Sequence, residues 1–171
     1  NIEGVNSLGR WISNKLGAIG FNRHVYSRAE FGNILYLTNH MDERNDVLII
    51  GNMDNPVDFE DYNSFHEEKG RIYGTGVARG KGGIAVLLGA VKALRYTRTL
   101  RKVKCGILLI PDESYGERSS KPIVDELSKL SKYVLGLSGA GLSGEVMTSC
   151  SGTLRYEIEI NRRQNKQGLK S

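Results

Sequence analysis

The chain has 171 residues, of which 39% are hydrophobic and 25% charged, with three prolines and two cysteines. This length accommodates one domain with a hydrophobic core and at most the beginning of another, and the composition excludes disordered, collagen-like and disulfide-scaffold proteins. The formal net charge of +5 would suit nucleic acid, but the densest basic run, residues 95–104, has little aromatic interleaving. A solvated connection between a helix and a strand is the simpler interpretation, so nucleic acid is not an expected partner.

In chain order, the hydrophobic periodicity predicts a helix over residues 5–19, strands over 24–27, 33–38 and 47–51, a polar functional loop over 52–76, a helix over 82–98, a strand over 103–110, a helix over 122–130, and strands over 133–137, 145–150 and 153–160. This order predicts the α/β class, as a three-layer sandwich with a mixed, largely parallel sheet and helices on both faces. The strands that lead to Asn52, Pro111 and Ser138 are expected to end at a common cleft.

No apolar run approaches the ~18 residues that a membrane span requires, and no leader peptide is recognised. We therefore expect no membrane partner and take the cytoplasm as the default compartment. The separation of Cys105 and Cys150 fits neither a zinc ribbon nor a disulfide framework, so both are expected to be reduced, structural thiols.

Three glycine-rich segments raise the question of nucleotide binding. Residues 74–80, GTGVARG, resemble a dinucleotide fingerprint but follow a polar loop instead of a buried strand. Lys81 is not followed by the Ser or Thr of a phosphate loop, and strand-like residues follow the glycines of 139–144. Residues 136–139 lack the last glycine of a serine-hydrolase elbow. None of these segments predicts a site.

The three histidines, His24, His40 and His66, are too widely separated to predict a shared metal site. We expect each to be a surface residue.

A family resemblance rests on GNMD at residues 51–54, YGTGVARGKGG at 73–83 and PDES at 111–114. In this order and at these separations, they resemble the zinc aminoacylase and carboxypeptidase family, which includes acetylornithine deacetylase, succinyl-diaminopimelate desuccinylase and glutamate carboxypeptidase-like metallopeptidases. The resemblance implies a zinc-exopeptidase, or phosphorylase/hydrolase-like, fold. Residues 1–160 would be the N-terminal part of the metallopeptidase-like catalytic domain, and residues 161–171 a tail or the start of a lid domain.

Members of this family bind two zinc ions through a His and several carboxylates, and a further Glu activates the bridging water. The resemblance carries the role of this base to Glu113, and it carries the role of the Asp that orients the His ligand to Asp54. At the ligand positions stand Asn52 in place of His, Arg79 in place of the bridging Asp, and Ser114 and Ser138 in place of carboxylates. Amide, guanidinium and hydroxyl groups cannot replace these donors, so neither zinc nor another cofactor is expected.

The vacated positions predict a pseudoenzyme, a catalytically inactive relative retained for binding or assembly with an unidentified protein or small molecule. The alternative is an active metal-dependent hydrolase of amide bonds, a peptidase or N-acyl amino acid deacylase, because Asp54, Asp112, Glu113 and Glu117 still place carboxylates near the cleft. In the family the lid mediates dimers, so a homodimer would form through a lid that this truncated chain is expected to lack.

The loss of the zinc ligands also predicts an ion pair. Without zinc, Asp54 and Glu113 would face each other in a partly desolvated cleft. Arg79 stands at the position of the bridging Asp, and we expect its guanidinium to pair with one or both carboxylates. The substitution Arg79→Asp is then expected to destabilise the fold.

Overall fold

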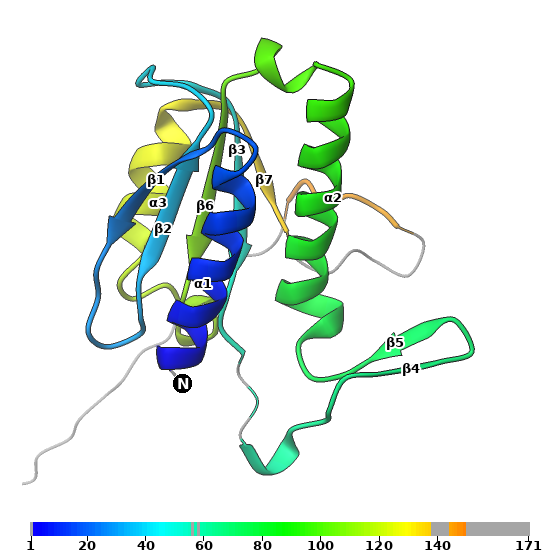
Figure 1. Ribbon diagram of the computed structural model, residues 1–171. Helices are drawn as coiled ribbons and strands as arrows, with labels where there is room; N and C mark the ends of the chain where they lie inside the picture. The colour runs from blue at the N-terminus through cyan, green and yellow to red at the C-terminus, as the bar shows by residue number, and fades with distance from the viewer. Residues whose placement is uncertain (1, 56, 58, 138–143, 150–171) are drawn as a thin grey trace, which may run out of the picture. The chain divides into compact units, whose positions relative to one another are not determined.

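The computed structural model describes residues 2–55, 57, 59–137 and 144–149 (Figure 1). The chain divides into residues 1–139 and residues 140–171, and each part is described by itself. In the second part, residues 144–149 form neither helix nor strand. The strand predicted over 145–150 is therefore wrong over its described residues, because strand-forming residue types make a strand only where a partner strand pairs with them. The strand predicted over 153–160 and the boundary at 160/161 lie outside the described residues.

A five-stranded mixed sheet forms the centre of the first part. Its strands, in spatial order, are β1 (Asn22–Tyr26), β2 (Ile34–Thr38), β6 (Cys105–Ile110), β3 (Asn45–Asn52) and β7 (Ser131–Gly136). β2 runs antiparallel to both β1 and β6, whereas β3 runs parallel to both β6 and β7. The predicted α/β fold with a mixed sheet is confirmed. Because β3, β6 and β7 share one direction, their carboxyl ends lie at the same edge of the sheet.

Helices cover both faces of this sheet (Figure 1). α1 (Ile2–Gly17) and α2 (Gly82–Tyr96) lie on one face, and α3 (Lys121–Lys129) lies on the other. Alternate side chains of β6 point to opposite faces of the sheet. Ile107 packs in the core beneath α1 and α2, whereas Leu108 packs with Ile123 of α3. A strand covered on both sides has no polar face, which explains why the sequence of β6 is apolar throughout. The three-layer arrangement is as predicted.

The segment after β3, predicted as a loop over 52–76, contains regular structure. A short helical turn, η1 (Phe59–Asp61), precedes a two-stranded hairpin of β4 (His66–Glu68) and β5 (Arg71–Tyr73). Each strand is three residues long, and every residue in it is exposed. The prediction of a loop was wrong here because strands without a buried face carry no hydrophobic alternation. Over the described residues, no helix is long and apolar enough to cross a membrane.

Candidate functional site

The ends of β3 and β6 bring the predicted site residues together. Asn52, the last residue of β3, pairs in register with Ile110, the last residue of β6, and the backbone N–H of Met53 donates to the Ile110 carbonyl at 2.8 Å. The segments that follow the two strands therefore begin side by side. The predicted convergence of Asn52 and Pro111 is confirmed, and Ser138 lies outside the described residues.

Asn52 and Glu113 are joined directly. Glu113 opens a short helical turn, η4 (Glu113–Tyr115), and its Oε2 accepts a hydrogen bond of 2.7 Å from Nδ2 of Asn52. The other side of Asn52 lies against the backbone of Gly80, where a Cβ would come within 2.6 Å of Asn52 Oδ1 and 2.7 Å of its carbonyl oxygen. Asn52 is thus held between the carboxylate and a position that only glycine fits.

Arg79 does not join this cluster. It lies in a helical turn, η2 (Val77–Lys81), at a kink with φ −103° and ψ −107°, and it is exposed. None of the ion pairs among the described residues, taken to 4.0 Å, connects Arg79 with Asp54 or Glu113. The predicted pairing is therefore wrong. The physical reason is that Asn52 of β3 already donates to Glu113, while Arg79, at the kink, is exposed to solvent.

Lys81 is the cation that lies at the site. Its Nζ donates to the carbonyl oxygens of Asp54, at 2.6 Å, and Met53, at 3.0 Å. Burial lowers the pKa of Lys81, and the charge of Asp54 opposes this shift. The ammonium group thus fastens the start of α2 to the chain that leaves β3. The residue pattern does not indicate this role of Lys81, because backbone carbonyl acceptors are not visible in the sequence.

Asp54 has one satisfied oxygen and one unsatisfied oxygen. Its side chain lies in a residue that is only 7% exposed, and Oδ2 accepts the backbone N–H of Ser114 at 2.8 Å. Its Oδ1 is buried and has no hydrogen-bond partner. An unpaired buried carboxylate oxygen is costly, so it calls for a physical explanation. The hydroxyl-bearing Ser114 itself is exposed and contributes its backbone instead of its side chain.

Asp112 secures the loop that carries Glu113. It is fully buried, and its Oδ2 accepts the Ser119 N–H at 2.6 Å, the Ser119 hydroxyl at 2.9 Å and the Ser120 N–H at 3.1 Å. These donors immediately precede α3, where a negative charge is favoured by the helix dipole. Its Oδ1 is also buried without a partner. Burial raises the pKa of the nearby Glu117, a shift that Lys121 opposes and Asp112 and Glu113 reinforce.

The side chains that the structure describes do not fit a pair of zinc ions. Among the described residues, no three His, Cys, Asp or Glu side chains are grouped so that they could hold a metal ion. His24 and His66 are exposed, whereas His40 is half-buried and bonds to Asn45 at the opposite end of β3. The prediction of a surface location is thus met for His24 and His66 and too simple for His40. The donors at the ligand positions are an amide committed to Glu113 and an exposed guanidinium.

Two cavities adjoin the site. One, of about 210 Å³, is lined by Asp54 together with Phe31, Tyr115 and other residues. The other, of about 340 Å³, is mainly apolar and extends from Lys81 to Ile72 of the hairpin, and Phe65, just before the hairpin, forms part of its wall. The arrangement therefore offers apolar surface beside two carboxylates and an anchored ammonium group, a combination suited to holding a small, partly apolar ligand.

Comparison with known proteins gives a consistent set of relatives. The model of peptidase family M20/M25/M40 matches residues 38–167. Carboxypeptidase G2 of Pseudomonas sp. (strain RS-16) is 29% identical over 97 residues, which cover 57% of this chain and 23% of that protein. Human carnosine dipeptidase 1 has a similar fold, with a TM-score of 0.68 and 17% identity over 81% of this chain and 34% of that chain. An M20 family metallo-carboxypeptidase from Sulfolobus solfataricus gives a TM-score of 0.62 and 20% identity over 82% and 33%. The chain thus spans about a third or less of the length of these proteins.

Proposed function

Because the chain belongs to peptidase family M20/M25/M40, we propose that it is a metal-free relative of that family's hydrolases, retained for binding or assembly and not for amide-bond hydrolysis. The observation that carries the proposal is the hydrogen bond of 2.7 Å from Asn52 to Glu113. The resemblance places the catalytic base at Glu113 and a zinc-binding His at position 52. Here the amide at position 52 donates to the base itself, in place of a metal-bound water.

The unsatisfied oxygen of Asp54 supports the same proposal. In the family this carboxylate orients the His ligand, whose ring N–H it accepts. With asparagine at position 52 and its amide directed to Glu113, Asp54 Oδ1 is buried with no partner. The carboxylate has kept its position and its bond to the Ser114 backbone but has lost the side chain that it would orient.

The apolar cavity beside Lys81 supports a binding role. It is lined by two aromatic residues that precede the hairpin, Tyr62, which is 60% exposed, and Phe65, which is 67% exposed. Large exposed aromatic side chains next to a cavity are typical of surfaces that bind a partner. The partner in this proposal is an unidentified protein or small molecule. The proposal also includes self-association through the family's lid domain.

A specific observation favours one alternative, an active metal-dependent amide hydrolase with an atypical site. Asp54 Oδ1 and Asp112 Oδ1 are both buried without a hydrogen-bond partner, and such atoms also occur where a cation binds. In that alternative Glu113 would still serve as the base.

Elemental analysis distinguishes the two functions. The full chain is purified, incubated with zinc, passed through a desalting column, and analysed for bound metal and for hydrolysis of N-acetyl amino acids and dipeptides. We expect far less than one zinc ion per chain and no hydrolysis. The quadruple variant N52H/R79D/S114E/S138D, which restores a His or a carboxylate at four ligand positions of the family, is the positive control and should retain more zinc. Stoichiometric zinc in the wild type, with hydrolysis that Glu113→Gln abolishes, would overturn the proposal.

A further inference from the structure

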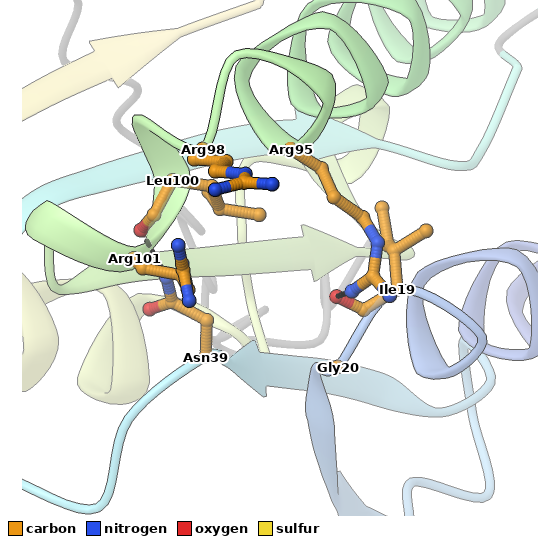
Figure 2. Close-up of a pocket in the computed structure, with 7 residues that line it drawn as sticks. All are labelled: Ile19, Gly20, Asn39, Arg95, Arg98, Leu100 and Arg101. Carbon is orange, nitrogen blue, oxygen red and sulfur yellow. Dashed lines mark hydrogen bonds between the residues drawn. The ribbon is translucent and has the colours of Figure 1, made fainter.

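A third cavity lies at the opposite end of the sheet from the candidate site. It occupies about 620 Å³ between the turn after α1, the end of β2 and the connection from α2 to β6, which includes the short helical turn η3 (Leu100–Lys102). Three arginines line it, Arg95, Arg98 and Arg101, together with Ile19, Asn39 and Leu100. Figure 2 shows the three guanidinium groups directed into the same space. The volume is within the range of about 300–1,000 Å³ that is usual for small-ligand sites.

The positive charge in this pocket is not balanced. No acidic residue lines the cavity, and no ion pair within 4.0 Å among the described residues involves Arg95, Arg98 or Arg101. Lys102 adds a further cation to an adjoining depression that Arg98 and Arg101 also line. Like charges around one cavity repel each other and raise the local concentration of anions. A bound anion would relieve this repulsion.

Hydrogen bonds hold two parts of the pocket in place. Arg95 Nη1 donates to the Ile19 carbonyl at 2.6 Å, which fixes this guanidinium between α2 and the turn after α1 (Figure 2). Asn39 Nδ2 donates to the carbonyls of Leu100, at 3.0 Å, and Val103, at 2.9 Å. These bonds fasten η3, which carries Arg101, to the end of β2. A site whose donors are already positioned loses less entropy when it binds a ligand.

Arg98 has a backbone conformation that disfavours an arginine. Its φ is +60°, in the left-handed region, where residues with a Cβ are uncommon and glycine is free of strain. The chain turns here from α2 into η3, and the Arg98 N–H donates to the Arg95 carbonyl at 3.0 Å. Glycine would make this turn without strain, so the presence of an arginine here calls for a role of its side chain. Residues with a strained backbone conformation are often found at binding sites, where the side chain has a functional role.

We propose that Arg95, Arg98 and Arg101 form a binding site for a small ligand that carries a diphosphate or two neighbouring phosphate groups. The planar guanidinium fork binds phosphate oxygens through paired hydrogen bonds. A single phosphate group carries about −1.5 to −2 charges near neutral pH, which leaves three guanidinium groups only partly neutralised. Two phosphate groups match the charge of the pocket better, and the volume accommodates them together with part of a larger molecule.

Calorimetric titration of the full chain with sodium pyrophosphate at low ionic strength tests the proposal. We expect one binding site whose affinity falls by about tenfold or more in Arg98→Gly and in Arg101→Gln, since each removes a charged hydrogen-bond donor. The Arg10→Gln variant, on the exposed side of α1, loses one positive charge elsewhere and should bind as the wild type does. Inorganic phosphate should bind more weakly than pyrophosphate, and added salt should weaken both.

The variant Arg98→Gly separates a ligand-binding role from a structural one. Glycine accepts the left-handed conformation without strain, so the free energy of unfolding should stay the same or increase while the affinity falls. Equal pyrophosphate binding by the wild type and both pocket variants would overturn the proposal, as would the absence of binding. Equal affinity for phosphate and pyrophosphate would remove the requirement for two phosphate groups. Binding of single-stranded RNA that depends on Arg98 and Arg101, without binding of pyrophosphate, would replace the small ligand with nucleic acid.

Discussion

Nδ2 of Asn52 lies 2.7 Å from Oε2 of Glu113, although the two residues are 61 positions apart in the sequence. Their contact is a consequence of topology, because β3 and β6 are parallel neighbours and end in register. The family resemblance assigns a zinc ligand and a catalytic base to these two positions. In this chain the two side chains bind each other, which makes the pair the natural place to test how the site is stabilised.

Replacing the amide of this pair by a carboxylate should destabilise the fold. Asn52→Asp puts two like charges at hydrogen-bond distance, and we expect the free energy of unfolding to fall by about 1–3 kcal/mol at pH 7. Urea denaturation at pH 7 measures this, with Asn14→Asp on the exposed face of α1 as the control. A loss no larger than that of the control would contradict the pairing.

Alanine substitution should have opposite effects on stability at two glycines, Gly80, which lies against Asn52, and Gly89, which has open space around it. In Gly80→Ala the new Cβ would lie 2.6 Å from Asn52 Oδ1, so the chain must shift, and we expect a loss of about 1–3 kcal/mol. In Gly89→Ala, on the exposed side of α2, nothing lies within 4 Å of the new Cβ. Alanine there should stabilise the helix by about 0.5–1 kcal/mol. Thermal unfolding of the two variants gives the comparison, and a neutral Gly80→Ala would show that the contact is not tight in solution.

The architecture was predictable from the sequence because burial leaves a pattern. β6 is apolar at every position since both its faces are covered, and the polar residues after β3 and β6 marked the sheet edge at which the site lies. The hairpin of β4 and β5 left no such pattern, because all its residues are exposed. For residues 145–149, strand-forming residue types alone predicted a strand, although a strand also needs a partner.

The side-chain contacts of the site were less predictable. Family position suggested that Arg79 would replace the metal, but the direction of its side chain depends on a backbone kink that residue types do not reveal. Lys81 was overlooked for the complementary reason, since it binds backbone carbonyls and needs no acidic partner. The partner of Glu113 is a neutral amide, which charge complementarity does not indicate.

Glu117 should make stability depend on pH. Burial raises its pKa in the folded state, and the charges of Asp112 and Glu113 add to the shift. The folded state therefore holds this proton more tightly than the unfolded state does. The stabilisation is present in full below the unfolded pKa of about 4.3 and is lost as the pH rises through the raised folded value.

The variant Glu117→Gln isolates this contribution. The free energy of unfolding of this variant, relative to that of the wild type, should increase as the pH rises from 4 to 8. The reason is that the glutamine carries no charge that burial penalises. Glu126→Gln, an exposed position on α3, is the control for removing one negative charge nearby. A difference between Glu117→Gln and the wild type that does not change with pH would contradict the shift.

Cys105 should be an unreactive thiol in the folded protein. It is 3% exposed in β6, and burial raises its pKa to about 11. Since the thiolate is the reactive form, iodoacetamide at pH 8 should label it only after unfolding in urea. The experiment uses the Cys150→Ser variant, in which Cys105 is the remaining cysteine. Because the pKa of Cys105 is raised in the folded state, its contribution to the free energy of unfolding is lost as the pH rises from about 8.5 through about 11. Labelling of the folded protein at the rate of the unfolded chain would contradict the burial.

The last prediction reverses the one that the sequence suggested for Arg79→Asp. Had the guanidinium paired with Asp54 or Glu113, its replacement by a carboxylate would have destabilised the fold. Because Arg79 is exposed and has no such ion pair, we now expect the free energy of unfolding to change by no more than about 0.5 kcal/mol. Urea denaturation measures this, and Gly80→Ala at the next position is the matched variant that should be destabilised. A loss above about 1 kcal/mol at low salt that disappears at high salt would restore the ion pair, since screening weakens only charge interactions.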